Sequence, residues 1–192
     1  MRLDPTTTRT APAADRIPPC AGADGCRRIR GSEPDYGRHP ITLITHEDPI
    51  GKDLIDHRVQ ADLPDRKDGW REQLGVRRLA GDTFEVACLP FFTQGICHRD
   101  VVAVDDDQLV TSVVHKSGHR TLRVALVMKY EVDREKAREM IQAKVSETGL
   151  PHEWLHGTYL AVDLPPGSNA DSLVHLLTSL AQSGNLFWEI ES

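Results

Sequence analysis

Residues 121–149 read TLRVALVMKYEVDREKAREMIQAKVSETG, and the change of period within this stretch decides the fold. The first ten residues alternate apolar with polar side chains, which is typical of a β-strand. From Asp133, an N-cap residue type, apolar side chains recur at helical spacing as far as Gly149, a C-cap residue type. This apolar stripe consists of Ala137, Met140, Ile141 and Val145. We therefore predict a strand and then a helix that is capped by Asp133, ends at Gly149 and buries the stripe.

Two short strand patterns follow this helix. They occupy residues 153–156 and 158–164, and the sequence PPG at residues 165–167 ends the second one. We expect residues 153–156 to lie at the edge of a sheet. Because an exposed edge can pair with another chain, the sequence also permits a homodimer.

A second helix is predicted next, with Ser168 or Asn169 as its cap and its end near Gly184. Its apolar face is formed by Leu173, Leu176, Leu177 and Leu180. A last strand covers residues 186–190. The order strand, helix, strand, strand, helix, strand is that of the split βαββαβ arrangement, so we predict a ferredoxin-like unit over residues 120–192.

The preceding part of the chain has strand patterns separated by Gly and Asp. They lie at residues 70–78, 82–88, 100–104 and 109–115. We predict a small antiparallel β unit over residues 55–116, and therefore an α+β protein. Residues 41–54 are expected to be a transitional segment. Residues 1–40 hold 6 of the 12 prolines and few apolar side chains, which predicts a disordered tail.

Charge and hydropathy exclude several classes of protein. No apolar run approaches the roughly 18 residues that would cross a bilayer, and the N-terminal residues lack the apolar run of a secretory signal, so we expect a cytoplasmic protein. Residues 41–192 hold 16 Lys and Arg against 24 Asp and Glu. Such an acidic region is unsuited to nucleic acid, which requires a basic surface. Its negative charge is explained first as a means of staying soluble, and it also favours a basic partner.

Metal and disulfide motifs are weak in this sequence. The four cysteines show no CxxC spacing; Cys88 and Cys97 are expected to be buried thiols, whereas Cys20 and Cys26 fall in the tail. His152, Glu153 and His156 match the HExxH pattern of zinc hydrolases, which requires a helix. Because Pro and Gly flank the match, we interpret it as a short strand and expect no metal and no cofactor.

Three patches resemble a bacterial family known as domain of unknown function 4265. They are residues 84–96 (FEVACLPFFTQGI) followed by Asp100, residues 117–124 (SGHRTLRV) and residues 160–166 (LAVDLPP). The resemblance covers about residues 55–192 and implies no reaction, cofactor or catalytic residue. At Cys97–His98 the sequence departs from the family pattern, so the resemblance gives that pair no role.

The apolar sequence LPFF at residues 89–92 suggests a binding site. Pro90 interrupts a strand, so that the two adjacent rings point to different sides; either both belong to the core, or one faces the core and the other a groove. We predict a binding site that combines these rings with the nearby turn, formed by Phe91, Phe92, Gly95, Gly118, His119 and Arg120. The alternative is a catalytic set in which Cys97 is the nucleophile, His98 or His119 the base, and Asp100 the residue that orients the imidazole.

The sequence favours a binding protein over an enzyme, because it contains no phosphate-binding loop and no nucleophile elbow. We expect a non-catalytic binding or regulatory protein of a bacterial cytoplasm that neutralises or modulates a partner protein. The alternative is a small-molecule enzyme, or an accessory protein of a biosynthetic pathway, with a His/Cys site between the two units.

Overall fold

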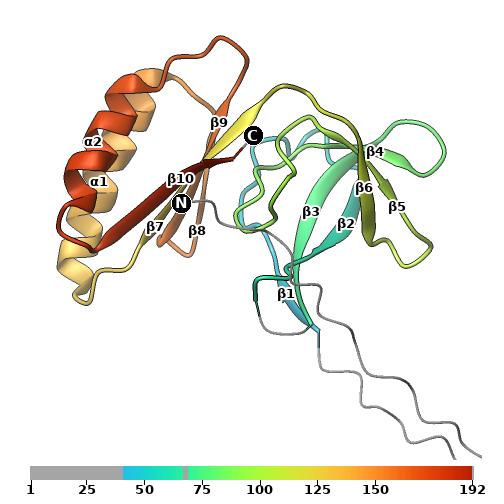
Figure 1. The fold of residues 1–192 in the computed structure, drawn as a ribbon, viewed down its shortest axis with the longest axis horizontal. Coiled ribbons are helices and arrows are strands. Elements are labelled where there is room, and N and C mark those ends of the chain that lie inside the picture. The colour runs from blue at the N-terminus through green and yellow to red at the C-terminus, as the bar shows by residue number, and fades with distance from the viewer. Residues whose placement is uncertain (1–40, 67–68, 192) are drawn as a thin grey trace, which may run out of the picture. The chain divides into compact units, whose positions relative to one another are not determined.

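The computed structural model describes residues 41–66 and 69–191, so the predicted tail and its two cysteines lie outside the described residues. The fold is α+β, with two helices and two sheets (Figure 1). The elements are β1 (Thr42–Ile44), β2 (His57–Asp62), β3 (Trp70–Arg78), β4 (Thr83–Val86), β5 (Val101–Val104), β6 (Val110–His115), β7 (Arg120–Leu126), α1 (Glu131–Thr148), β8 (His152–Leu155), β9 (Tyr159–Leu164), α2 (Asp171–Ala181) and β10 (Leu186–Glu191).

The C-terminal sheet has four antiparallel strands in the order β10-β7-β9-β8. Both helices lie on one of its faces (Figure 1). The predicted succession of strands and helices is correct, and β8 is an edge strand as expected. The opposite face of this sheet is therefore free of helices and available to the rest of the chain.

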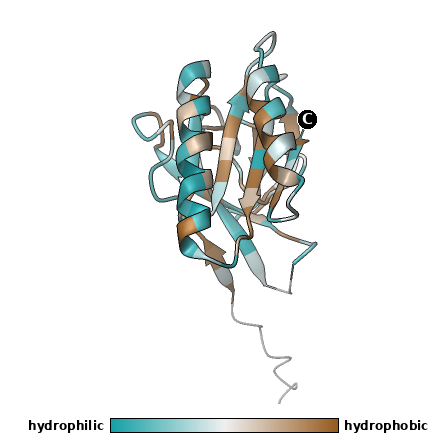
Figure 2. Cartoon of the chain, turned by 90° about the vertical axis from the view of Figure 1, so that its left-hand side faces the viewer, coloured by the Kyte–Doolittle hydropathy of each residue, from teal (hydrophilic) through white to brown (hydrophobic). Residues whose placement is uncertain are grey.

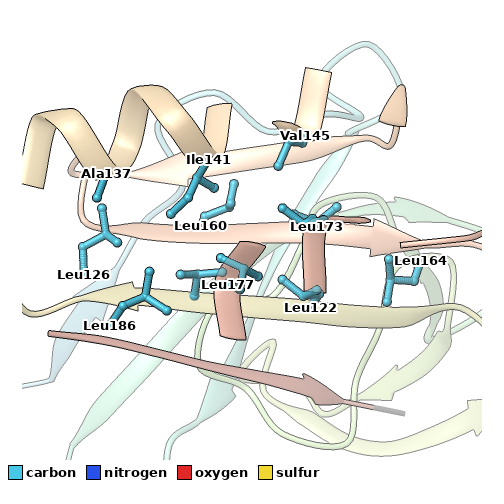
Figure 3. Packing of buried hydrophobic residues seen from close by; sticks show 12 residues of the cluster. Leu122, Leu126, Ala137, Ile141, Val145, Leu160, Leu164, Leu173, Leu177 and Leu186 are labelled. Carbon is cyan, nitrogen blue, oxygen red and sulfur yellow. The ribbon is translucent and has the colours of Figure 1, made fainter. Parts of the chain in front are cut away.

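The core of this half lies between the helices and the sheet. Side chains of α1 point toward leucines of β7 and β9 (Figure 3), and the buried members are Leu122, Val124, Leu126, Ala137, Ile141, Val145, Leu160, Val162, Leu164, Leu173, Leu177 and Leu186. Met140 was predicted to belong to the buried stripe of this helix, and this prediction is wrong, because Met140 is 50% exposed. The helical stripe is thus narrower than the sequence pattern indicated.

The helix ends also differ in part from the prediction. The N-cap of α1 is Tyr130, so that Asp133 lies inside the first turn, where its carboxylate is close to the positive end of the helix dipole. Gly149 is the C-cap, with the left-handed conformation that was expected. The second helix, α2, ends at Ala181, three residues before Gly184.

Figure 2 views the helices from their outer side, where hydrophilic residues cover most of α1. Within the part of the chain that the structure describes, neither helix combines the length and the apolar character needed to cross a membrane.

The N-terminal sheet is built around β3, which pairs with β2 on one side and with β1 and β4 on the other. It is antiparallel as predicted except at β1, which comes from the predicted transitional segment and runs parallel to β3. The sheet curls back on itself, because the N–H of Gln60 in β2 donates a hydrogen bond to the carbonyl of Gln108 (2.8 Å) just before β6. Its core is Val59, Ala61, Leu74, Val76, Phe84, Val86, Cys88, Ile96, Val102 and Val104.

Adjacent residues of α1 test this assignment of the core. We expect Ile141→Ala to lower the free energy of unfolding by about 2–5 kcal/mol, because it leaves a cavity under the helix, and Met140→Ala to change it by less than about 0.5 kcal/mol. Urea denaturation followed by circular dichroism measures both. Equal effects of the two substitutions would contradict the burial described above.

Candidate functional site

The helix-free face of the C-terminal sheet carries the polar side chains of the candidate site. Leu122, Val124 and Leu126 of β7 point into the helix-side core, so the alternate residues of that strand point to the other face. Strand register aligns these residues in three rows across the sheet. The rows are Glu191, Thr121 and Asp163; then Glu189, Arg123, Ala161 and Glu153; and then Phe187, Ala125, Tyr159 and Leu155.

The segment of residues 89–93 (LPFFT) covers the middle of this face without forming a strand. The carboxylate of Glu72, from β3, accepts its backbone hydrogen bonds: Phe91 N–H donates to Oε1 (2.7 Å), and Phe92 and Thr93 N–H donate to Oε2 (3.0 and 2.7 Å). The hydroxyl of Thr93 also donates to Oε2 (2.7 Å). One buried carboxylate thus satisfies three successive amides that have no partner in a sheet.

Glu153 of β8 has the same role at the start of this segment. Its Oε1 accepts hydrogen bonds from the backbone N–H of Leu89 (2.8 Å) and of Ile50 (3.0 Å). Its Oε2 lies 2.8 Å from Nδ1 of His46, and Nε2 of the same imidazole lies 3.2 Å from Oε1 of Glu72. His46 therefore connects the two carboxylates.

This geometry requires a protonated imidazole, because only imidazolium donates from both nitrogens. Burial acts to lower the pKa of His46, but its contact with Cys88 and its hydrogen bonds to Glu153 and Glu72 outweigh burial and raise the pKa to about 12. Burial acts to raise the pKa of Glu72, but the hydrogen bond and charge of His46 and the amides of the segment hold it below its usual value. The three side chains form a buried ion cluster, carboxylate–imidazolium–carboxylate.

The guanidinium of Arg123 binds the carbonyls of the same segment. Nε donates to the carbonyl of Pro90 (3.0 Å), and a terminal nitrogen donates to the carbonyl of Thr93. Its other terminal nitrogen pairs with Glu189 and Glu191 at 3.3 Å. We call Glu72, His46, Glu153 and Arg123 the buried charge network.

One end of the helix-free face holds a histidine–aspartate cluster, formed by His98, His119 and Asp163. Nδ1 of His98 lies 3.0 Å from Oδ2 of Asp163, and Nδ1 of His119 lies 2.8 Å from Oδ1. The side chains are 12%, 14% and 2% exposed, respectively. Burial acts to raise the pKa of Asp163, but hydrogen bonds from the two imidazoles hold it below its usual value.

The two histidine-bearing loops are joined by Asp100, which is fully buried. Its carboxylate accepts hydrogen bonds from the N–H of Cys97 (2.9 Å) and of Ser117 (2.7 Å). The hydroxyl of Ser117 lies 2.8 Å from the carbonyl of His98 and accepts a bond from the N–H of His119 (3.1 Å). Asp100 therefore fixes the backbone next to both imidazoles, and the expectation that it orients an imidazole directly is wrong.

Cys97 is a free, fully buried thiol, and burial raises its pKa. Its sulfur lies 4.0 Å from the backbone carbonyl of Glu191, and the partner that orients the imidazoles is Asp163 rather than Asp100. Of the predicted catalytic set, the structure thus brings His98 and His119 together and leaves the thiol without the thiolate character that a nucleophile needs.

The opposite end of the face forms a groove of about 250 Å³, which we call the aromatic groove. Phe92 stacks edge-on against Tyr159, with ring centroids 4.9 Å apart, and the guanidinium of Arg66 lies 4.2 Å above the Phe92 ring. Phe187 of β10 is 61% exposed at its side. Phe91, by contrast, is 5% exposed and packs in a third apolar cluster, between the two sheets, with Leu89, Leu155 and Ala161.

The other residues of the predicted binding site, Gly118, Arg120 and Gly95, lie away from the aromatic groove. Gly118, with a positive φ of 81°, lies close to Pro166, and Arg120 begins β7 beside His119. Gly95 donates its N–H to Glu191 (2.9 Å). The rings and the turn were expected in one spot. Phe92, however, packs against Tyr159, whereas His119 of the turn bonds Asp163, which lies four residues, or about 13 Å, further along β9.

The HExxH residues lie on a strand and a turn. His152 and Glu153 belong to β8, and Glu153 serves the buried charge network. His156 is exposed, has a positive φ of 51°, and pairs with Glu47 at 2.7 Å.

Sequence reasoning missed Glu72, Arg123, His46 and Asp163, and it named Glu153 only as part of the HExxH match. A signal existed for Glu72, which shares the alternation of Leu74 and Val76 on β3 and so occupies a buried position of that strand. The others required the pairing of strands that are distant in sequence.

Residues 72–188 match a protein family described as domain of unknown function (DUF4265), in agreement with the three patches noted in the sequence. No curated protein matches the chain. A similar fold occurs in a structure described as a novel crystal structure of a hypothetical protein from Neisseria gonorrhoeae, with a TM-score of 0.53 and 19% identity. The match covers 69% of this chain and 91% of that chain, and at this identity it concerns the fold alone.

The raised pKa of His46 predicts a dependence of stability on pH. Above about pH 6.5 the unfolded chain releases the imidazole proton and the folded chain keeps it, so this contribution to stability is complete below that pH and is lost as pH rises toward 12. Between pH 7 and 8.5 we expect the free energy of unfolding to fall by up to about 1.4 kcal/mol per pH unit.

Urea denaturation at several pH values in this window measures the slope, with His46→Gln as the control in which the slope should become shallower; the difference between the parent and the variant is the contribution of His46. The thiols of Cys88 and Cys97, whose pKa is raised by burial, add a slope of the same sign as pH approaches 8.5, and this part of the slope remains in the variant. If the parent and the variant had the same slope, His46 would not hold a proton in the folded protein.

Proposed function

Because the chain belongs to the family of domain of unknown function DUF4265, whose description names no activity, we propose its function from its own geometry. It is a non-catalytic binding protein that receives an extended segment of a partner protein along β10 and in the aromatic groove. The observation that carries this proposal is the exposed Phe187, on an edge strand beside the open groove.

The β10 strand has the features of an edge that accepts another strand. It lies at the end of the order β10-β7-β9-β8, so alternate N–H and C=O groups along it point away from β7. Its sequence, LFWEIE, contains no Lys and no Pro, the residues that commonly protect edges from pairing. Phe187 and Ile190 are 61% and 38% exposed. Addition of a strand would satisfy the backbone groups, and a partner side chain in the groove would cover Phe187.

The groove indicates what the added strand carries. An aromatic or branched apolar side chain would enter between Phe92, Tyr159 and Phe187, where apolar surface is open. Glu189, whose side chain is 60% exposed, lines the same groove and favours a Lys or Arg nearby in the partner. The acidic balance of residues 41–192 supports a basic partner in the same way.

Two further assignments belong to this proposal. We assign residues 120–192 to the ferredoxin-like folds, on the basis of the strand order and the two helices on one face. We place the protein in a bacterial cytoplasm, where it modulates its partner, because Cys88 and Cys97 are free thiols of the kind that a reducing compartment maintains.

Photo-crosslinking tests the docking site. We expect a benzoylphenylalanine at position 187, incorporated in the producing cells, to form an adduct with one partner protein, because that side chain borders the occupied groove. The same group at Val114, an exposed position of β6, is the control and should form no such adduct. Tandem mass spectrometry should locate the adduct in a segment that has an apolar or aromatic residue within two positions of a Lys or Arg.

A synthetic peptide with the sequence of that segment then measures affinity. Phe187→Ser should weaken its binding by roughly 10-fold or more, since a buried Phe contributes about 1.5–3 kcal/mol, whereas Ile190→Ser, on the other face of β10, should change it less than twofold. Adducts at neither position or equally at both would overturn the proposal. An adduct between two copies of the chain would show that the bound segment comes from a second copy, in a homodimer, and not from another protein.

The histidine–aspartate cluster favours a second candidate, a small-molecule enzyme that uses His98 and His119 with Asp163. Its version with Cys97 as nucleophile has a direct test. We expect iodoacetamide at pH 7.5 to alkylate Cys97 at least about 10-fold more slowly in the folded protein than in urea, because the thiol is buried and its pKa is raised. Peptide mapping by mass spectrometry gives the rates, and faster alkylation in the folded state would restore the thiol mechanism.

A further inference from the structure

We propose that His98, His119 and Asp163 bind one divalent transition-metal ion, of which Zn²⁺ is the representative. This site is distinct from the aromatic groove, and it departs from the expectation that the chain holds no metal. Two imidazoles and one carboxylate are ligands that suit Zn²⁺ and its neighbours in the first transition row.

The distances within the cluster are close to those of a metal site. The ligand atoms of the three side chains all lie within 4.8 Å of one another. Zn²⁺ binds nitrogen and oxygen at about 2.0–2.2 Å, so two ligands of one tetrahedral ion lie on the order of 3.4 Å apart. The nitrogen–oxygen distances of 2.8 and 3.0 Å would therefore lengthen by about half an ångström when an ion replaced the bridging protons.

The backbone already holds the ligands in place. Asp163 is an internal residue of β9, and its N–H donates to the carbonyl of Pro151 (2.8 Å). His98 and His119 lie on two loops that Asp100 and Ser117 join through the hydrogen bonds described above. Metal sites of high affinity have such an outer shell, because it spares the ordering of the ligands on binding.

The charge of Asp163 supports a cation at this position. Among the residues that the structure describes, its ionic partners within 4.0 Å are the two imidazoles, with no Lys or Arg. The other buried carboxylates lie beside a cation: Lys116 for Asp100, and the imidazolium of His46 for Glu72 and Glu153. A bound divalent ion would take the place of the imidazole protons as the partner of this buried carboxylate and would compensate its charge.

Solvent reaches the cluster only slightly, as the exposures of 12% and 14% for the two imidazoles show. An ion can therefore enter while most of its surroundings stay protein. Three protein ligands leave at least one coordination position for water or for a ligand from another molecule, which is the arrangement of open zinc sites.

Titration of the metal-free, full-length protein tests the proposal. After treatment with chelator, we expect Zn²⁺ to bind with one equivalent by calorimetry, and Co²⁺ to give the visible absorption of an ion with nitrogen ligands in low coordination. His98→Gln, His119→Gln and Asp163→Asn should each weaken Zn²⁺ binding by more than about 100-fold. Ser117→Ala should weaken it by about 10–100-fold, as is typical of an outer-shell residue.

Matched controls exclude the other candidate ligands. His152→Ala combined with His156→Ala removes the HExxH histidines, and Cys20→Ser combined with Cys26→Ser removes the thiols near the N-terminus; neither pair should change the affinity by more than twofold. Circular dichroism confirms that each variant is folded. The site would be refuted by Zn²⁺ binding weaker than millimolar, or by binding that survives the ligand substitutions and disappears in a control. Phe187→Ser should leave Zn²⁺ affinity unchanged, so that failure of one proposal is distinguishable from failure of the other.

Discussion

The structure depends on the buried carboxylate–imidazolium–carboxylate cluster of Glu72, His46 and Glu153. The residues that it holds, 89–93, lie between the two sheets but cannot join either one, because Pro90 has no N–H to donate and the chain there is irregular. Without the two carboxylates, the backbone N–H groups of Leu89, Phe91, Phe92 and Thr93 would be buried without a partner, at a cost of about 1–3 kcal/mol each. The two carboxylates accept four of these hydrogen bonds, and Arg123 donates to two carbonyls.

The position of this segment explains why the face has two different ends. Residues 89–93 cover the row that contains Arg123 and Glu153, and both of these side chains bond to the segment. At the row of Asp163 the cover consists of the loops that carry His98 and His119, so imidazoles meet a carboxylate. At the row of Tyr159 the segment packs Leu89 and Phe91 against Leu155 and places Phe92 beside Tyr159, and the face stays open toward Phe187 as a groove. One irregular segment thus sets the chemistry of both candidate sites.

The sequence predicted the parts of the fold that depend on local pattern. The strands and helices of residues 120–192 follow from period and caps, and their order limits the topology to few possibilities. The parallel pairing of β1 with β3 was not predictable in this way, because it joins segments about thirty residues apart through backbone bonds alone. His98 and His119 were recognised as candidates from the sequence alone. Asp163 was not, because only the register of the strands places it beside them. Charged residues such as Glu153 and Arg123 are read as surface residues until the segment that covers them is known.

The buried charge network also bears on what the face is for. Apolar side chains of similar volume would hold two sheets together at least as well as buried ions, whose desolvation is costly. Apolar side chains could not, however, accept the amide hydrogen bonds of Phe91, Phe92 and Thr93, and without those bonds the segment would have to become a regular strand or leave the interface. The network therefore keeps Phe92 at a fixed place beside Tyr159 while leaving the adjoining surface open, which is the property that a binding surface requires and a core does not.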